Sequence, residues 1–304
     1  MISILIPIYN YEVGRVAKDL LQQCQALGKE YEIILADDGS TNEDIRKKNK
    51  TLLATINVNY IEVKNNIGRS KIRNFLAKES KGDMLLFLDC DSGVVRKDFV
   101  SKYLYCSKDY DVVSGGTIYC EKEKVSPQYL LHWTSGKERE EGKKHFTTNN
   151  FLIKKEVFEK VCFDESIKGY GHEDTILGEE MREKGYRIGH IDNPVEHLGL
   201  KTNDKFISDI SNASKNLALL YKQEKYKPYL ENITLIKAYK KIRNIHCNKI
   251  FLFCFKVLKP FIFNNLKGKR PNIKLLDMVK LYSFITIEEK ENAHYLEYNG
   301  RARQ

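Results

Sequence analysis

Cysteine and proline are scarce in this chain, and neither follows a pattern that would define a fold. Only 6 of the 304 residues are proline, and the 7 cysteines are an odd number with no C-x-x-C pair. This number and spacing argue against a disulfide framework or a zinc cluster. With 42% hydrophobic and 30% charged residues, the composition is globular rather than disordered or collagen-like. We therefore expect a protein of the reducing cytoplasm with a core that needs no disulfides.

The N-terminus lacks the features of a signal peptide. The first ten residues, MISILIPIYN, contain no basic segment and do not lead into a long apolar run. A secretory signal needs both. The segment is instead typical of a first β-strand.

Acidic residues are missing from one stretch near the C-terminus. Residues 232–276 contain no Asp or Glu but eleven Lys and Arg residues. The formal net charge of the whole chain is +10, so the remainder is close to neutral. The excess positive charge is confined to this region, so any function of that charge must be sought there.

The first hundred residues alternate apolar runs with amphipathic stretches. Residues 13–27, for example, have helical spacing and are followed by Gly28, a typical helix stop. Such alternation predicts βαβ units and a parallel sheet, so the expected fold class is α/β. The expected strands are 2–8, 31–37, 59–63 and 84–89, and the expected helices are 13–27, 43–55 and 70–78.

Beyond residue 100 the pattern is less regular, and helical spacing dominates the last hundred residues. We expect an α/β domain over residues 1–204 and a basic, aromatic-rich helical region over 205–304. Ahead of that boundary we expect strands over 111–119, 146–155 and 186–191, helices over 156–161 and 173–184, and a polar loop holding His197.

Polar residues gather where the expected parallel strands end. Asn10, Asp37, Asp38, Asp89 and Asp91 all follow apolar runs. In parallel α/β sheets, ligands bind beyond the carboxyl ends of the strands. This coincidence favours a binding site over a series of surface turns.

The segment LLFLDCDSG (85–93) places Asp89 and Asp91 directly after one of these strands. Two interpretations are open. Asp and Gly favour turns, so the segment could be a strand that reaches the surface. A D-x-D pair can also hold Mg²⁺ or Mn²⁺, because these hard cations prefer carboxylate and phosphate oxygens.

Two further segments also have a binding and a structural interpretation. LADDGST (35–41) offers an acidic pair that could bind a nucleobase N–H or a ribose hydroxyl, or could form an Asp-Gly turn. NNIGRSKIRN (65–74) places Arg69, Lys71 and Arg73 at a helix start. There they could meet a diphosphate or lie on a solvated helix face.

A second acidic pair, Glu173 and Asp174, stands at an expected helix N-terminus in GYGHEDTILGEEM (169–181). Either carboxylate could be a cap that the helix dipole stabilises. Alternatively, a carboxylate here could take a proton from an attacking hydroxyl, and the two preceding glycines suggest close approach to a ligand. His197, in PVEHLGL, is either structural or, beside a D-x-D, a further metal ligand.

Taken together, six segments within roughly residues 1–200 resemble family 2 glycosyltransferases of the GT-A fold. Each segment is modest alone, but six in the right order are specific. GYGHEDTILGEEMREKG is similar to the E-D helix of bacterial chondroitin-type polymerases and animal β-1,4-galactosyltransferases. The other five are ISILIPIYN, LADDGST, NNIGRSKIRN, GDMLLFLDCDSG and TTNNFLIKKEVFEKVCFDE.

The resemblance implies how a nucleotide-sugar donor would be bound, with uridine as the expected base. Pro7, Tyr9, Asp38 and Asp89 would line the nucleoside pocket, and Asp38 would face the base. Arg73 matches the family arginine near the nucleotide.

The resemblance also implies the metal ligands and the catalytic groups. Asp91 would ligate Mn²⁺ or Mg²⁺, and His197 would supply a further ligand. Asp174 would be the catalytic base, with Glu173 as its sugar- or acceptor-binding neighbour.

The chain departs from the family pattern in three ways. His172 stands where related enzymes usually have glycine, and Thr175 follows the E-D pair in place of another acid. His190 is a rival to His197 as a metal ligand. These departures concern the sugar specificity and the identity of the histidine ligand.

We therefore expect an inverting, metal-dependent glycosyltransferase that extends a surface polysaccharide or glycolipid. A sugar nucleotidyltransferase would also combine βαβ units with metal-binding aspartates. However, it normally has a glycine-rich triphosphate loop after the first strand, and IPIYNYEVGR lacks one. A non-catalytic sugar-binding protein on the same fold is the remaining alternative.

The basic region near the C-terminus, residues 235–270, has two interpretations of equal weight. It is rich in aromatics and lysine and is interrupted by Pro260, and it is too short and too charged for a transmembrane helix. An amphipathic surface with lysines suits the anionic inner face of a membrane. The alternative is a helical subdomain that packs its aromatics inward. Nucleic-acid binding is not expected, because no recognition motif accompanies the charge.

Overall fold

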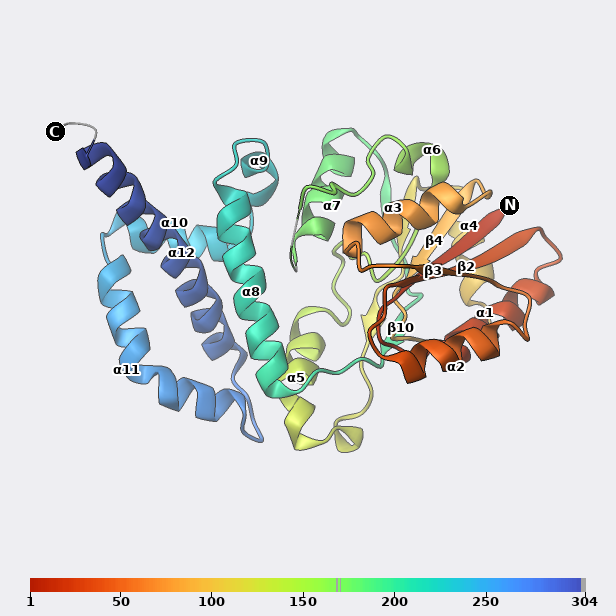
Figure 1. Cartoon of the computed structure of the whole chain (residues 1–304), viewed down its shortest axis with the longest axis horizontal. Coiled ribbons are helices and arrows are strands. Elements are labelled where there is room, and N and C mark those ends of the chain that lie inside the picture. Colours follow the sequence, from red (N-terminus) through yellow and green to blue (C-terminus); the bar gives the residue numbers. More distant parts are fainter. Residues whose placement is uncertain (168, 170, 302–304) are drawn as a thin grey trace. The chain divides into compact units, whose positions relative to one another are not determined.

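The computed structural model describes residues 1–167, 169 and 171–301, of which residues 290–301 are described by their backbone alone. The chain forms two compact units (Figure 1). The first consists of Met1–Cys120, Gly136–Lys168 and Glu173–Gly199. The second consists of Glu121–Ser135, Gly169–His172 and Leu200–Gln304.

The first unit is built on a seven-stranded sheet in the order β3-β2-β1-β4-β8-β6-β9. The strands from β3 to β4 are parallel, β8 is antiparallel to both of its neighbours, and β9 is parallel to β6. This confirms the predicted α/β class with a mostly parallel central sheet. The strands are β1 (Ile2–Ile8), β2 (Tyr31–Asp38), β3 (Asn59–Val63), β4 (Met84–Leu88), β6 (Val112–Ser114), β8 (Asn150–Lys154) and β9 (Ile188–His190).

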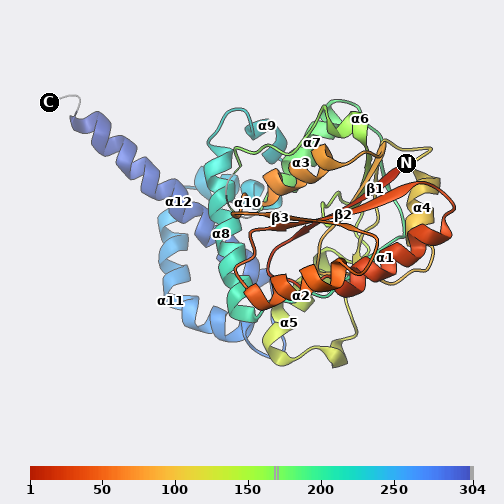
Figure 2. The same cartoon turned by 45° about the vertical axis from the view of Figure 1, so that its right-hand side comes forward.

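Helices cover both faces of this sheet (Figures 1 and 2). Residues of α1, α2 and α4 join the apolar cluster on one face, and residues of α3, α6 and α7 join the cluster on the other. The first three helices are α1 (Gly14–Ala26), α2 (Glu43–Leu53) and α4 (Phe99–Cys106), and the other three are α3 (Arg69–Glu79), α6 (Lys155–Phe158) and α7 (Glu173–Glu183).

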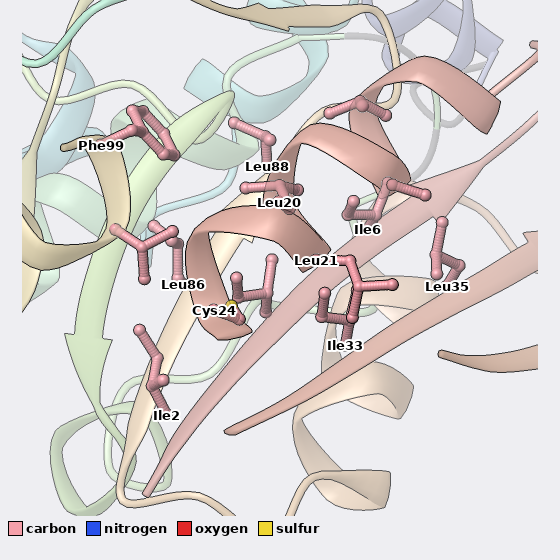
Figure 3. Packing of buried hydrophobic residues seen from close by; sticks show 14 of the residues in the cluster. Ile2, Ile6, Leu20, Leu21, Cys24, Ile33, Leu35, Leu86, Leu88 and Phe99 are labelled. Atoms are coloured by element: carbon pink, nitrogen blue, oxygen red, sulfur yellow. The ribbon is translucent and has the colours of Figure 1, made fainter. Parts of the chain in front are cut away.

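The core beneath α1 follows from the spacing of its apolar residues. Leu20, Leu21 and Cys24 recur within one helical turn and pack with Ile6 of β1 and Leu35 of β2, as Figure 3 shows. Alternate residues of each strand face this side and the others face α3 and α7. Because both sides are covered, the strands are apolar almost throughout.

The opposite side of β4 is held by aromatic rings. Phe87 is fully buried, and its ring lies 4.9 Å from that of Phe151 in β8 and 5.2 Å from that of Phe158 in α6. Phe163 meets the same ring edge-on at 6.4 Å. Stacked and edge-on pairs of this kind stabilise a core beyond the area that they bury. They fix β4, the strand that leads into Asp89 and Asp91.

Three predicted strands are shorter than expected. The strand expected over 111–119 is divided into β6 and β7 (Thr117–Ile118), which belong to different sheets. Gly116 lies between them with a φ of +85°, a left-handed value that ends an extended strand. The strands expected over 146–155 and 186–191 contract to β8 and β9.

A second sheet, which the sequence patterns do not predict, has the order β5-β10-β7. Its strand β5 (Ser92–Val94) runs antiparallel to β10 (Val195–His197). The expected polar loop around His197 is therefore wrong, because His197 ends a strand and pairs with Ser92. The pairing joins segments that are distant in the chain, so no local pattern indicates it. Helices α4 and α5 (Leu130–Arg139) were also not predicted.

The C-terminal helices of the second unit confirm the predicted helical extension. α12 packs along α8 and contacts α10 and α11. The predicted interruption at Pro260 is wrong, because α11 continues through it. Pro260 is exposed, so the carbonyl that loses its helical partner lies at the surface, where proline is best tolerated. The helices are α8 (Asn203–Tyr221), α9 (Lys227–Leu230), α10 (Thr234–Asn244), α11 (Asn248–Leu266) and α12 (Ile273–Arg301).

Gly185 ends α7 in a conformation that disfavours other residues. Its φ is +78°, its N–H donates to the carbonyl of Arg182, and the next N–H, of Tyr186, donates to the carbonyl of Met181. A Cβ added at Gly185 would meet no atom within 4 Å, so only backbone strain opposes a substitution. We expect Gly185→Ala to lower the free energy of unfolding by about 1–2 kcal/mol.

Equilibrium urea unfolding measures this change, and Gly185→Asn separates strain from side-chain size. Asn tolerates the left-handed region better than Ala, so the larger Asn side chain should cost less than the methyl group. Glu183→Ala, at an exposed position of the same helix, is the control. An Ala variant as stable as the parent would contradict the conformation described for Gly185.

Candidate active site

The carboxyl ends of β1, β2 and β4 meet at one edge of the sheet because these strands are parallel neighbours. The loop after β1 is tied to the loop after β2. Asn10, with a φ of +51°, accepts a hydrogen bond at Oδ1 from the Asn42 N–H at 2.9 Å. Its own N–H donates to Ser40 Oγ at 2.8 Å. The segments that follow β1, β2 and β4 therefore all lie at this edge, and the first two are joined by these hydrogen bonds.

Asp91 and His197 are brought together by the second sheet. β5 follows the D-x-D segment directly and pairs with β10, and the N–H of Leu198 donates to the Asp91 carbonyl at 2.8 Å. As a result, Asp91 Oδ2 lies 3.7 Å from His197 Nδ1. Gly199 passes so close that a Cβ there would overlap the Asp91 carboxylate. The backbone around the carboxylate is therefore fixed from both sides.

The surroundings of Asp91 are poorly hydrated and carry excess negative charge. Burial raises the pKa of Asp91; the neighbouring His197 lowers this pKa and Asp89 raises it again. Burial, followed by the Asp91 charge, raises the pKa of Tyr11 to about 12. Tyr11 follows the first strand and is a site residue that the sequence analysis did not single out. A cation would relieve this charge.

The donor set fits a hard divalent cation that the substrate helps to coordinate. Within residues 1–167, 169 and 171–301, no three His, Cys, Asp or Glu side chains form a complete cluster for a metal. Asp91 and His197 supply two donors. Mg²⁺ and similar ions commonly take one or two protein ligands and complete their shell with phosphate oxygens and water.

Arg73 is buried beneath the D-x-D segment and paired with its first aspartate. The Arg73 side chain is 4% exposed, and its Nη2 donates to Asp89 Oδ1 at 2.5 Å. Its guanidinium also lies over the ring of Phe163, with Cζ 5.6 Å from the centroid. The alternative of a solvated helix face is therefore wrong for Arg73, although Arg69 and Lys71 are exposed.

Asp37 and Asp38 both bind the chain itself. Asp37 accepts hydrogen bonds from the Ser40 N–H at 2.7 Å and from the Tyr60 hydroxyl at 3.2 Å. Asp38, also buried, accepts at both carboxylate oxygens, from the N–H groups of Ile67 at 2.7 Å and Gly68 at 3.1 Å. This acidic pair therefore shapes the two loops at the ends of β2 and β3. The role of Asp38 toward a base stays a prediction.

The two remaining nucleoside-pocket candidates lie at the end of β1. Tyr9 is 47% exposed and Pro7 is half-buried. Tyr9 thus presents a ring on the edge where the loops of Asp38 and Asp91 end. Aromatic rings at such positions can stack on a flat ligand.

Glu173 and Asp174 begin α7, as predicted. Asp174 Oδ1 accepts the Thr175 N–H at 2.7 Å. Burial raises the pKa of Asp174, and the Thr175 N–H and the Arg73 charge oppose that rise. Glu173 is 7% exposed; its Oε1 lies 3.8 Å from Arg69 Nη1, and Oε2 has no hydrogen-bond partner among the described residues. An unpaired buried carboxylate oxygen is costly and indicates a role toward a ligand.

The unusual histidines near the site differ in their surroundings. His172, directly before Glu173, has a φ of +77°, which explains physically why glycine would suit this position. His190 lies at the end of β9, and burial and the charges of Arg182 and two other basic residues lower its pKa. Thus His197, and not His190, is the histidine next to Asp91.

Comparison with known proteins identifies the family. Residues 3–163, more than half of the chain, match the family described as "Glycosyl transferase family 2". An uncharacterized glycosyltransferase of Haemophilus influenzae is 26% identical over 285 residues, which cover 85% of this chain and 90% of that protein. Undecaprenyl-phosphate 4-deoxy-4-formamido-L-arabinose transferase of Edwardsiella ictaluri is 26% identical over 132 residues, which cover 40% of this chain and 38% of that protein.

Two solved structures resemble this one. A mannosyltransferase of Pyrobaculum calidifontis in complex with GDP-Man and Mn²⁺ has a TM-score of 0.54 and 12% identity, over 96% of this chain and 86% of that one. Glucosyl-3-phosphoglycerate synthase of Mycobacterium tuberculosis, in complex with Mn²⁺, UDP and phosphoglyceric acid, has a TM-score of 0.52 and 16% identity. This likeness covers 73% of this chain and 77% of that one. These likenesses establish the GT-A fold. The family match, on a sheet of this topology, means that the chain is a glycosyltransferase and belongs to glycosyl transferase family 2.

Proposed function

We propose that this glycosyltransferase is inverting and metal-dependent, and that it moves a sugar from a nucleotide diphosphate to a glycan or glycolipid acceptor in surface polysaccharide synthesis. The observation on which the proposal depends is the approach of Asp91 Oδ2 to His197 Nδ1, 3.7 Å apart where β10 pairs with the segment that follows β4. Buried Arg73 pairs with Asp89, and its charge also acts on Asp174 at the start of α7, which supports a shared site for these groups.

Asp91 and His197 are the residues that would hold Mn²⁺ or Mg²⁺. When bound, such an ion neutralises negative charge on the two phosphates of the donor and of the departing nucleoside diphosphate. Asp89 has a different task in this proposal. Arg73 Nη2 donates to its Oδ1, and this charge-assisted bond would fix the orientation of Asp89 toward the nucleoside.

The nucleoside would lie at the edge formed by the loops after β1 and β2. Pro7 and the exposed ring of Tyr9 offer an apolar surface there. Asp38 would act on the base through the loop that it holds, since both its carboxylate oxygens accept backbone N–H groups of that loop. We thus place Asp38 in the pocket as a residue that shapes it.

Asp174 would be the base for the transfer step. The acceptor hydroxyl oxygen forms a bond to the anomeric carbon from the face opposite the diphosphate. The bond from that carbon to the diphosphate oxygen breaks, and its electron pair leaves with the nucleotide. Asp174 accepts the hydroxyl proton. A single displacement of this kind inverts the anomeric centre. Glu173, whose Oε2 has no hydrogen-bond partner in the described part of the chain, would hold a hydroxyl of the sugar or of the acceptor.

The names of related proteins support the donor and acceptor classes. The two structural neighbours bind UDP or GDP-Man together with Mn²⁺, so both bases are candidates, and uridine remains our prediction. The Edwardsiella relative is named for transfer to undecaprenyl phosphate, a lipid carrier. A lipid-linked acceptor would be reached from the cytoplasm at the inner face of the membrane, which is the location that we propose.

A donor screen tests the proposal. We expect the thermal unfolding midpoint to rise by about 5 °C when UDP or a UDP-sugar is added at saturating concentration with Mn²⁺, and by much less without Mn²⁺. GDP, GDP-Man and nucleoside monophosphates are the matched comparison ligands. The metal-dependent proposal fails if no nucleoside diphosphate shifts the midpoint, or if the shift is the same with and without the cation.

A further inference from the structure

Helix α11 has two apolar faces, and the residues that the structure describes cover one of them. Phe255, Ile262 and Leu266 are buried in the core of the second unit together with residues of α8 and α12. The opposite face, which we call the exposed stripe, consists of residues that recur three or four positions apart. They are Ile250, Phe253, Cys254, Val257, Leu258 and Phe261. This spacing places them on one side of the helix.

The exposed stripe is more apolar than an ordinary surface. Phe253 is 68% exposed and Phe261 is 75% exposed, two turns apart on the same side of α11. Single exposed apolar residues need no explanation, but a contiguous patch marks an interaction site. The interpretation that the aromatics of residues 235–270 pack inward is therefore right for some aromatics of α11 and not for others, and the membrane interpretation stays a prediction.

Basic residues border the exposed stripe, and acidic residues are absent from its surroundings in the sequence. Lys249 and Lys256 are exposed and lie two turns apart, so they follow one edge of the stripe. The segment 267–270 adds three more basic residues directly after α11. No Asp or Glu occurs between residues 232 and 276. The stripe is thus an apolar surface bordered by lysines, with one carboxylate nearby at the start of α11, where Glu289 accepts a hydrogen bond from Asn248 at 2.8 Å.

We propose that the exposed stripe docks this protein on an anionic lipid bilayer, with α11 lying parallel to the surface. The apolar side chains would enter the boundary between headgroups and acyl chains, and the lysines would reach lipid phosphates. Within the residues that the structure describes, no helix has the length and apolar run needed to cross a membrane. The association is therefore peripheral. It goes beyond the proposed transfer reaction and does not require it.

The positive charge around the exposed stripe favours an anionic bilayer, rather than a second copy of this chain, as its partner. Two copies that met stripe to stripe would bring the lysines that border each stripe together, and like charges oppose such a contact. An anionic bilayer instead offers both an apolar layer and negative charge. Each lysine near such a surface strengthens binding about fivefold, and the effect falls with salt.

Co-sedimentation of the full chain with lipid vesicles tests the proposal. We expect binding to vesicles of phosphatidylcholine mixed with phosphatidylglycerol, weaker binding to pure phosphatidylcholine, and loss of the difference at high salt. The double variant Phe253→Ser, Phe261→Ser should weaken binding at least about tenfold, because it removes the two most exposed apolar groups of the stripe. The double variant Lys249→Gln, Lys256→Gln should weaken binding to the anionic vesicles and leave binding to pure phosphatidylcholine unchanged.

Matched controls separate the stripe from general surface effects. Tyr105→Ser removes an aromatic residue that is 70% exposed on α4, and Lys18→Gln with Lys47→Gln removes two exposed charges from α1 and α2. Both controls should bind vesicles as the parent does. All variants alter exposed positions, and we therefore expect the fold to stay intact. Unchanged thermal unfolding midpoints will check this.

Three results would overturn the proposal. The first is a parent protein that stays in the supernatant with anionic vesicles. The second is vesicle binding that the stripe variant leaves unchanged. The third is a dimer of the parent that the stripe variant converts to monomer, since a second copy would then cover the stripe. The assay contains no donor, metal ion or acceptor, so these results leave the proposed transfer chemistry untouched, and a failed donor screen would leave the docking surface untouched.

Discussion

Replacing Asp174 with Asn is expected to lower kcat for sugar transfer by a factor of about 10²–10⁴, which is the usual contribution of a positioned general base. The amide keeps the size of the side chain and can still accept the Thr175 N–H, so the start of α7 should persist. It cannot take the acceptor proton. We therefore expect the thermal stabilisation by nucleotide and Mn²⁺ to remain while transfer is lost.

The pH dependence of transfer supplies a second readout of the same group. Burial raises the pKa of Asp174, so the carboxyl becomes protonated at a higher pH than an ordinary aspartate. Only the ionised form can act as base. The rate should therefore fall as the pH drops through this raised pKa, and the residual activity of the Asn variant should lack that fall.

Glu183→Gln is the matched control for Asp174→Asn, because it removes an exposed carboxylate from the other end of α7. It should transfer sugar at the parent rate. An Asp174→Asn enzyme that also transferred at the parent rate would rule out Asp174 as the base. Loss of nucleotide binding in that variant would instead assign Asp174 to the donor site.

The parts of the fold that the sequence predicted are those with a local physical cause. β1 to β4 and the three helices between them follow from apolar periodicity and from helix stops, which act over a few residues. The position of the candidate site follows as well. Parallel strands place their carboxyl ends at one edge, so Asp37, Asp89 and the residues that follow them had to lie close together.

The parts that the sequence did not predict depend on contacts between distant segments. The pairing of Ser92 with His197 creates the second sheet, and nothing near either residue indicates it. The burial of Arg73 against Asp89 is of the same kind, since a basic residue in a helix usually faces solvent. The asparagine directly after the first strand, Asn10, which bridges two loops, is the signal that could have pointed to the tie between β1 and β2.

Replacing Asp91 with Asn is expected to abolish the Mn²⁺-dependent part of nucleotide binding and to lower transfer by a factor of about 10² or more. An amide oxygen is a neutral and weaker ligand than a carboxylate oxygen, and it leaves His197 as the remaining donor of the pair. The measurement is the thermal unfolding midpoint with UDP, across a range of Mn²⁺ concentrations. Asp98→Asn, at an exposed aspartate before α4, is the control.

Gly199→Ala tests the same site without changing a proposed ligand. A methyl group there would overlap the Asp91 carboxylate, so the carboxylate must leave its position while its charge and its neighbours remain. We expect the Mn²⁺ concentration needed for half-maximal stabilisation to rise about 10- to 100-fold, as when a metal ligand loses its support. If Asp91→Asn weakened binding and Gly199→Ala did not, the charge of Asp91 would matter more than its position, and direct coordination would be the wrong explanation. If both variants weakened binding only in the presence of Mn²⁺, position and charge would act together, which is the behaviour that coordination requires.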